Sequence, residues 1–150
     1  MANTYSQMYA HCVWSTKRRD PLIPAEQREE LHRYITEIVK RRGQKLICIF
    51  CMPDHIHLLI GFRPCVAISD VVRDVKRESS EFISGKKWTP FKFEWQQGFG
   101  CFTCSHTDLD KVCDYILHQE EHHKNRTFED EYRLLMKKYG VDFEEKYLFD

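Results

Sequence analysis

Residues 45–61 read KLICIFCMPDHIHLLIG, and this stretch gives the clearest indication of the architecture. The run 45–51 is rich in β-branched and aromatic residues, which favours a strand, and residues 55–61 form a second apolar run. Pro53 and Asp54, between the two runs, are residues that turns prefer. The stretch therefore predicts a β-hairpin.

Helices are predicted on both sides of this hairpin, because apolar residues recur there at helical spacing between typical start and stop residues. Serine and threonine can cap the first turn of a helix, and glycine commonly ends the last one. The expected helices are residues 25–42, ended by Gly43; a long helix capped by Ser69; a helix from Thr107 to about His123; and residues 128–139, ended by Gly140.

Two further strands complete the expected sheet. Residues 9–15, YAHCVWS, predict the first strand. Residues 95–104, in which Gly98 and Gly100 stand among aromatic residues, predict a bent or bulged fourth strand. The order β-α-β-β-α-β followed by helices is that of the ferredoxin-like split βαβ pattern. The predicted fold is therefore α+β, with a four-stranded antiparallel sheet and C-terminal helices.

The length and composition of the chain indicate one globular domain. With 150 residues, 42% of them hydrophobic, we expect a single domain over residues 1–150, with a core at about 8–126 and a helical extension at about 127–150. That extension could cover a sheet edge or gate the site. The apolar runs are too short to span a bilayer, and the N-terminus lacks a signal-peptide pattern. Seven cysteines, an odd number, without an export signal indicate a reduced cytoplasmic protein with no membrane partner.

Charge is distributed unevenly along a chain whose formal net charge is zero. Residues 1–92 carry 16 basic and 10 acidic side chains, whereas residues 93–150 carry 7 basic and 13 acidic ones. A basic first part suits a polyanion, because Lys and Arg that neutralise phosphates release counterions. For any one basic cluster, an ordinary solvated helix face is an equal alternative.

His55 and His57 are the first candidate site residues. Two positions apart on a strand, they project from the same face. Two imidazoles side by side can bind a divalent metal and leave positions open for substrate oxygens. The alternative is a pair of half-exposed histidines that only pack on the sheet. Asp54 either orients the His55 ring by accepting its second N–H or only stabilises the turn.

Tyr115 and Gln119 are the second candidate pair, one turn apart in the predicted third helix. A tyrosine oxygen can attack phosphorus and form a covalent intermediate, but its ordinary pKa of about 10 means that it needs a nearby cation or base. The Gln119 carbonyl could help to bind that cation. Alternatively, Tyr115 is a core aromatic residue beside Val112 and Ile116.

Four stretches, in this order along the chain, resemble the HUH-type single-tyrosine transposases of the smallest bacterial insertion sequences, which include REP-associated forms. The stretches are YAHCVWSTK at 9–17, MPDHIHLLI at 52–60, WQQGF at 95–99 and YILHQEEHH at 115–123. The ordered set is more specific than any single piece and covers most of the chain.

The resemblance implies that His55 and His57 are the HUH metal ligands, that Gln119 is the third ligand and that Tyr115 is the nucleophile. It implies transesterification of single-stranded DNA, assisted by Mg²⁺ or Mn²⁺, through a 5′-phosphotyrosine intermediate. It also implies a homodimer, in which the tyrosine helix can serve the partner, and recognition of DNA hairpins. The candidate phosphate-contacting residues are Lys17, Arg18, Arg19, Arg73, Lys76 and Arg77.

Two other functions stay open at this point. One is a catalytically silent or domesticated hairpin-DNA-binding protein of the same fold. The other is a metal-dependent phosphodiesterase, which would release a hydrolysed product without a protein–DNA adduct.

Two further patterns do not support a site. Cys48 with Cys51, and Cys101 with Cys104, have the spacing of zinc half-sites, but positions three apart on a strand face opposite sides. Residues 118–122, HQEEH, lack the general-base glutamate of a metalloprotease at the second position. We therefore expect buried thiols, and surface histidines that could still contact DNA or lie beside the site. The histidines concerned are His118, His122 and His123.

Overall fold

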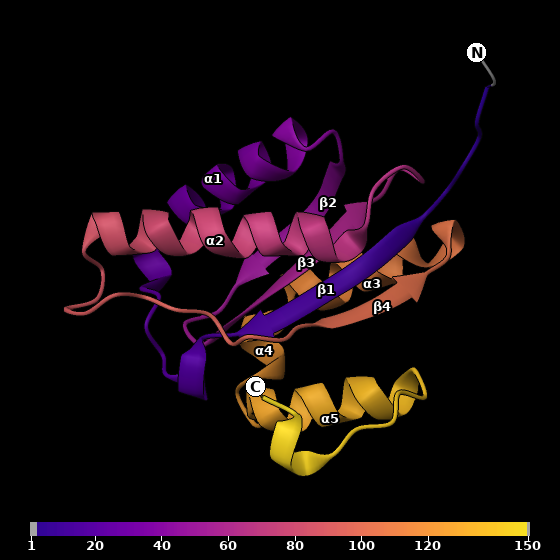
Figure 1. Ribbon diagram of the computed structural model, residues 1–150. Coiled ribbons are helices and arrows are strands. Elements are labelled where there is room, and N and C mark those ends of the chain that lie inside the picture. The colour runs from indigo at the N-terminus through magenta and orange to yellow at the C-terminus, as the bar shows by residue number, and fades with distance from the viewer. Residues whose placement is uncertain (1–2, 150) are drawn as a thin grey trace.

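Four strands form the central sheet of the computed structural model, which describes residues 3–149 (Figure 1). They are β1 (Tyr9–Ser15), β2 (Lys45–Cys51), β3 (His55–Gly61) and β4 (Gly100–Cys104). The order across the sheet is β2-β3-β1-β4, and every neighbouring pair is antiparallel. The predicted α+β fold, with the ferredoxin-like split βαβ arrangement, is confirmed.

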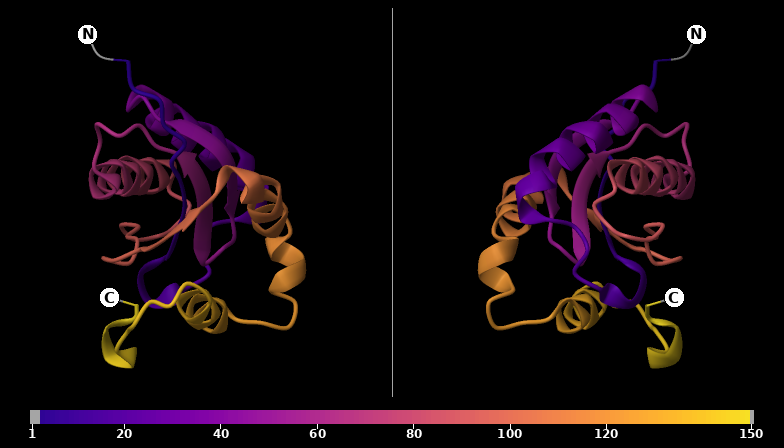
Figure 2. Two further views of the ribbon diagram at one scale, coloured as in Figure 1. Left: turned by 90° about the vertical axis from the view of Figure 1, so that its right-hand side faces the viewer. Right: turned by 90° about the vertical axis from the view of Figure 1, so that its left-hand side faces the viewer.

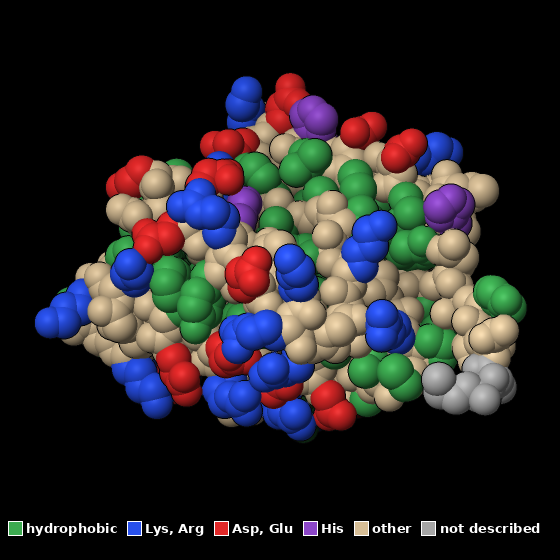
Figure 3. Space-filling view, turned by 90° about the horizontal axis from the view of Figure 1, so that it is seen from above, with side chains coloured by type: hydrophobic (Ala, Val, Ile, Leu, Met, Phe, Trp, Pro, Cys, Tyr) green, Lys and Arg blue, Asp and Glu red, His purple; other side chains and the backbone are tan. Residues whose placement is uncertain are grey.

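Helices cover both faces of this sheet (Figure 2). They are α1 (Arg28–Arg41), α2 (Ile68–Lys86), α3 (Leu109–Leu117), α4 (Gln119–His122) and α5 (Phe128–Lys138). Helices α1 and α2 lie on one face, and α3, α4 and α5 lie on the other. From the α1 side, Lys and Arg side chains are interleaved with Asp and Glu (Figure 3). None of the helices within residues 3–149 is both long and apolar enough to cross a membrane.

Side-chain alternation along β3 divides its residues between these two layers. Ile56, Leu58 and Ile60 are buried in the core under α1 and α2. His55 and His57 point the other way, toward α3, α4 and α5. The period-2 rule applied to the sequence therefore assigns each β3 side chain to the correct face. The same rule holds for the cysteine pairs, since Cys48 and Cys51 lie in different apolar clusters.

The fourth strand is shorter than the predicted residues 95–104, because only Gly100–Cys104 pair with β1. Upstream of it, Trp95 forms a single bridge with Thr16. The ammonium group of Lys76 donates to the carbonyls of residues 96, 97 and 98 at 2.8, 3.0 and 2.6 Å. These bonds direct the carbonyls toward α2 rather than toward a neighbouring strand, so the segment does not continue the sheet.

The predicted helix boundaries need three corrections. The third helix does not run unbroken to His123, because His118 separates α3 from α4 with φ −104° and ψ 28°. Ser69 lies inside α2 rather than capping it, since the N-cap position is Ala67. The first turn of the first predicted helix, residues 25–27, is a separate 3₁₀ turn.

Gly100 provides a test of how α5 packs on the sheet. A Cβ atom at this position would lie 2.7 Å from Cε1 of Tyr132 and 3.1 Å from Cγ1 of Val13. Since Tyr132 is 2% exposed, its ring has little room to move. We expect Gly100→Ala to lower the free energy of unfolding by about 1–3 kcal/mol, measured by urea denaturation.

The matched control is Gly85→Ala in α2, where a Cβ would meet no atom within 4 Å. This change should raise the free energy of unfolding by about 0.5–1 kcal/mol, since alanine favours helix more than glycine does. Unchanged stability in Gly100→Ala would contradict the packing of α5 described above.

Candidate active site

The two histidines of β3 lie side by side in the interior. His55 is paired across the sheet with Ser15 of β1, and His57 with Val13. Both imidazoles are 0% exposed, because α5 covers this part of the sheet and the ring of Phe128 stacks on His55 with centroids 4.5 Å apart. The histidines are therefore fully buried and not half-exposed. The C-terminal extension covers the site with α5.

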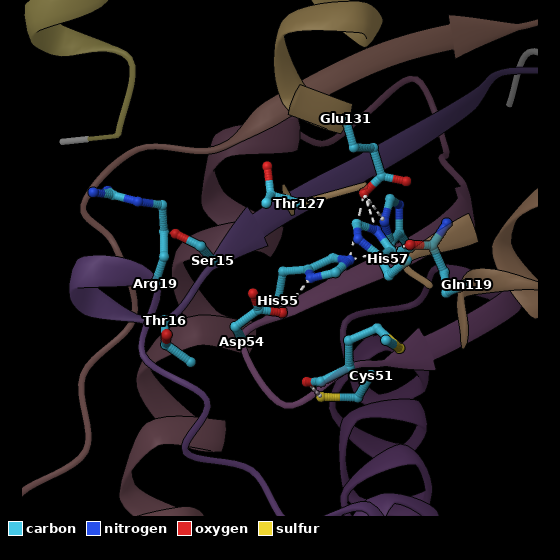
Figure 4. Close-up of polar contacts among 12 residues, drawn as sticks. Ser15, Thr16, Arg19, Cys51, Asp54, His55, His57, Gln119, Thr127 and Glu131 are labelled. Carbon is cyan, nitrogen blue, oxygen red and sulfur yellow. Dashed lines mark hydrogen bonds and ion pairs between the residues drawn. The ribbon is translucent and has the colours of Figure 1, made fainter. Parts of the chain in front are cut away.

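Glu131 of α5 is the residue on which this site converges (Figure 4). Its Oε1 lies 3.1 Å from Nε2 of His57 and 3.4 Å from Nε2 of His55. Nε2 of His123 lies 3.0 Å from the same oxygen. Within residues 3–149, His55, His57 and Glu131 are the one group of three His, Cys, Asp or Glu side chains with ligand atoms within 4.8 Å of one another.

Each β3 histidine has a second partner at its other ring nitrogen. Nδ1 of His55 lies 2.7 Å from Oδ1 of Asp54. The carboxylate in the turn therefore orients this imidazole. Nδ1 of His57 lies 2.7 Å from Nε2 of His11 on β1, and the two rings stack with centroids 5.0 Å apart. Both rings are therefore held with Nε2 facing Glu131.

Tyr115 and Gln119 reach this cluster from α3 and α4. The Tyr115 hydroxyl donates to Oε2 of Glu131, the carboxylate oxygen that does not contact the histidines. Oε1 of Gln119 lies 3.1 Å from Nε2 of His55, and its amide nitrogen donates to the Tyr115 carbonyl at 3.4 Å. All four predicted site residues therefore meet within one chain, beside a carboxylate that was not predicted.

Burial and hydrogen bonding determine the charge of this cluster. Burial alone would raise the pKa of Glu131, but His57 and the ring nitrogens bonded to the carboxylate hold that pKa well below its usual range. Burial would lower the pKa of His55, yet its bonds to Asp54 and Glu131 raise it to about 9. The cluster therefore contains an ionised carboxylate beside a positively charged imidazole.

Tyr115 is held in its protonated form in this arrangement. Burial raises the pKa of the phenol, and the charge of Glu131 with the hydrogen bond to it raises it further. Burial also lowers the pKa of His57, and it lowers that of His11 to about 3, so the His11–His57 pair is neutral. A phenol in this state needs compensating positive charge before it can act as a nucleophile.

Glu131 and His11 were not predicted from the sequence, and His123 was expected at the surface or beside the site, where it lies. His57 is 46 residues from His11 and 74 residues from Glu131 along the chain, so no local spacing rule connects them. One signal was present for Glu131, because the carboxylate falls on the helical stripe formed by Phe128, Tyr132 and Leu135, all buried. An acidic residue on the apolar face of a helix is a candidate site residue.

Most of the predicted phosphate-contacting residues already have acidic partners. Lys17 pairs with Glu94 at 2.9 Å, and Arg19 lies 3.7 Å from Glu129. The α2 residues Arg73 and Arg77 both contact Asp74, each at 3.3 Å. Arg18 is exposed and has left-handed backbone angles, with φ 63°.

Lys76 differs from the other five, because its ammonium group holds the three carbonyls described above and is half-buried. Burial lowers the pKa of Lys76 to about 8. Since α2 lies on the opposite face of the sheet from α3, its residues Arg73, Lys76 and Arg77 do not adjoin the Tyr115 hydroxyl.

Comparison with known proteins gives a consistent relationship. The family model described as IS200-like transposase matches residues 4–119. The chain is 32% identical over 74 residues to the ISDra2 transposase TnpA of Deinococcus radiodurans; this alignment covers 49% of the chain and 53%, about half, of that protein. It is 25% identical over 130 residues to the transposase for insertion sequence element IS200 of Salmonella typhimurium, covering 83% of the chain and 84% of that protein.

Solved structures agree with this relationship. A crystal structure of a Deinococcus radiodurans R1 protein assigned as a transposase superposes with a TM-score of 0.63 and 25% identity, over 79% of this chain and 95% of that one. A REP-associated tyrosine transposase bound to a REP hairpin also gives a TM-score of 0.63, over 83% of this chain and 73% of that one. Its identity is 16%, so this likeness concerns the fold alone. The family model covers most of the chain, which therefore belongs to the IS200-like transposase family.

Proposed function

We propose that this protein cleaves and rejoins single-stranded DNA by metal-assisted transesterification, with Tyr115 as the nucleophile. The observation that carries the proposal is the shared carboxylate of Glu131. One of its oxygens contacts His55 and His57, and the other accepts the Tyr115 hydroxyl. The proposed nucleophile and the proposed metal ligands are therefore connected through a single side chain, that of Glu131.

The donor set fits a divalent cation such as Mg²⁺ or Mn²⁺. Two imidazole nitrogens and a carboxylate oxygen within 4.8 Å of one another form a two-histidine, one-carboxylate group, and the amide oxygen of Gln119 is adjacent to it. His55, His57 and Glu131 would hold the ion, with Gln119 as a further ligand. When bound, the ion would polarise the scissile phosphate and neutralise developing negative charge.

The chain's own residues would then perform the transfer. The Tyr115 oxygen attacks phosphorus, a 5′-phosphotyrosyl bond forms, and the bond to the 3′ oxygen breaks. Oε2 of Glu131, which already accepts the hydroxyl, is positioned to receive the phenol proton, and the departing 3′ oxygen takes a proton from solvent water. In the reverse step a 3′-hydroxyl attacks the tyrosyl ester. The stored ester bond explains why no nucleotide cofactor is needed.

Family membership supports DNA as the substrate. The relatives are transposases, and one structural neighbour of the same fold is bound to a REP hairpin. We extend hairpin binding to this chain, with Lys17–Arg19, Arg73, Lys76 and Arg77 as backbone-contacting candidates. We also propose that the protein is a homodimer.

A hairpin-binding protein without catalysis is the second candidate function. The protonated state of Tyr115 favours it, because a protonated phenol is a weak nucleophile.

Incubation with a labelled single-stranded hairpin and Mn²⁺ tests the reaction. We expect a protein–DNA adduct that survives denaturation, and none when EDTA removes the metal. The adduct should be reversed by an oligonucleotide that carries a free 3′-hydroxyl, because that group attacks the tyrosyl ester. The readout is label retained with the protein on a denaturing gel.

Two outcomes would contradict this proposal. Hairpin binding without any adduct would favour the non-catalytic DNA-binding protein. A cleaved product released without an adduct would favour a metal-dependent phosphodiesterase.

His11 should affect metal binding through His57. If Nε2 of His57 binds the ion, Nδ1 carries the proton and donates it to Nε2 of His11, which fixes the ring. His11→Leu should weaken Mn²⁺ affinity about 10-fold or more, measured by titration calorimetry. His11→Gln, which retains an acceptor, should restore most of it. Equal affinity in wild type and His11→Leu would show that His11 only fills space.

A further inference from the structure

A groove of about 490 Å³ opens between α3 and α5 and ends at the site. Its inner wall includes His11, Tyr115 and Glu131, and its outer part is lined by β4 and the two helices. The volume is in the ~300–1,000 Å³ range of sites that enclose small molecules. The Tyr115 hydroxyl, which donates to Glu131, can therefore be approached from this side.

Three cationic side chains line this groove. Lys111 comes from α3, Arg126 precedes α5, and Lys138 is at the end of α5. All three are exposed, and none forms an ion pair with another residue of the described range 3–149. The acidic residues of the lining are Asp108, which is exposed, and the buried Glu131. Arg73 and Arg77 of α2, by contrast, already have carboxylate partners.

The positive charge extends to the reacting groups at the inner end of the groove. Arg126 lowers the pKa of Tyr115 against the larger upward effect of burial, and Lys138 adds to the lowering at His11. Arg126 and Lys138, at the two ends of α5, are thus within electrostatic range of Tyr115 and His11. A strand of phosphates in the groove would be attracted at both sides.

The rest of the wall is apolar and partly exposed. Leu134 is 46% exposed, and Val112, Leu135 and Tyr139 continue this surface. The Tyr139 ring is itself fixed by stacking on Phe102, with centroids 4.9 Å apart. Cations combined with apolar and aromatic surface are the combination that binds unpaired nucleotides, whose bases need a stacking partner and whose phosphates need positive charge.

We propose that this groove holds the unpaired DNA strand beside the scissile phosphate, with Lys111, Arg126 and Lys138 contacting its backbone. This inference rests on the proposed function and adds the path of the substrate. An unpaired strand fits better than a duplex, because the groove that leads to the hydroxyl runs between two helices. The hairpin stem would then lie elsewhere on the surface.

The test compares a Lys111→Gln/Lys138→Gln double variant with a Lys40→Gln/Lys45→Gln control, which removes the same charge from α1 and β2. All four lysines are exposed, so both variants should fold, which thermal melting checks. Binding of a fluorescent oligothymidine is measured by anisotropy at several salt concentrations. For the groove variant we expect the slope of log K against log salt to fall by about 1.4, since each single-strand phosphate contact contributes about 0.7. The control should match wild type.

Adduct formation with the hairpin and Mn²⁺ gives the second readout. At limiting DNA, the groove variant should form adduct at least about tenfold more slowly than wild type. A blunt hairpin without unpaired flanks should bind to the groove variant as tightly as to wild type. Equal slopes and equal adduct rates in groove variant, control and wild type would overturn the inference. So would an equal loss of blunt-hairpin binding, or equally tight binding of a polyglutamate peptide.

This design separates the inference from the proposed function. A slope change specific to the groove variant, in a protein that forms no adduct, would support the groove and contradict the transesterification. Wild-type adduct formation that is unaffected in the groove variant would support the reaction and contradict the groove.

Discussion

Tyr115→Phe is expected to form no denaturation-resistant adduct with a single-stranded hairpin and Mn²⁺. The substitution removes the one oxygen that the proposed reaction transfers to phosphorus. The ring itself should stay in place, because it stacks on His122 with centroids 4.8 Å apart and meets the His57 ring edge-on. Loss of a nucleophile typically lowers the rate by about 10⁴-fold or more, so the adduct should fall below detection. Hairpin affinity and Mn²⁺ affinity should stay within about twofold of wild type.

Tyr132→Phe is the matched control, since Tyr132 is a buried tyrosine of α5 and lies on the neighbouring β4 surface. It should form adduct at close to the wild-type rate. An adduct in Tyr115→Phe would mean that another residue is the nucleophile. Tyr139, which lines the same groove, would be the first to examine.

Glu131→Gln is expected to have the second-largest effect, because one carboxylate holds three histidines and the nucleophile. Without a metal, the substitution removes one of the two carboxylates that keep His55 charged, in a site where Glu131 is 1% exposed. Breaking a buried charge pair lowers the free energy of unfolding by about 3–5 kcal/mol. Because glutamine can retain some of the hydrogen bonds, we expect a decrease near the lower end of this range. Urea denaturation in the presence of EDTA measures it.

Glu131→Gln should also weaken Mn²⁺ binding by about 10- to 100-fold, since a neutral amide replaces a charged ligand. Titration calorimetry measures the affinity, and the adduct assay should fall with it. Asp130→Asn, the adjacent exposed acid, is the control and should leave both unchanged. Faster adduct formation in Glu131→Gln with unchanged metal affinity would show that the carboxylate restrains Tyr115 instead of binding the ion.

Charge counting along the sequence favoured residues 1–92 as the DNA-contacting part, whereas the cations that line the groove come from the other part of the chain. Residues 1–92 are net basic, yet Lys111, Arg126 and Lys138 come from the acidic part. Four of the six candidate phosphate-contacting residues, Lys17, Arg19, Arg73 and Arg77, lie beside carboxylates. Net charge adds up over residues that do not share a surface, so it is a weak guide to a binding face.

The strands and the pairing of His55 with His57 were predictable from the sequence, because both follow from a period of two residues along one strand. The predicted bounds of β1, β2 and β3 agree with the structure. The helices followed from apolar spacing, apart from the break at His118 and the boundaries at their first turns. These are properties of the local chain, in which backbone geometry alone fixes which side chains share a face.

Convergence of the site is a different kind of property. Glu131, His11 and His123 meet the β3 histidines because α5 folds back over the sheet and β1 pairs with β3, and no rule of local spacing connects them. Burial then determines their ionisation, since the same carboxyl or imidazole in water would have an ordinary pKa. The sequence by itself therefore determined the elements and the face on which each histidine stands. Only the tertiary structure, through long-range packing and exclusion of water, decided which groups share one carboxylate and which of them carry charge.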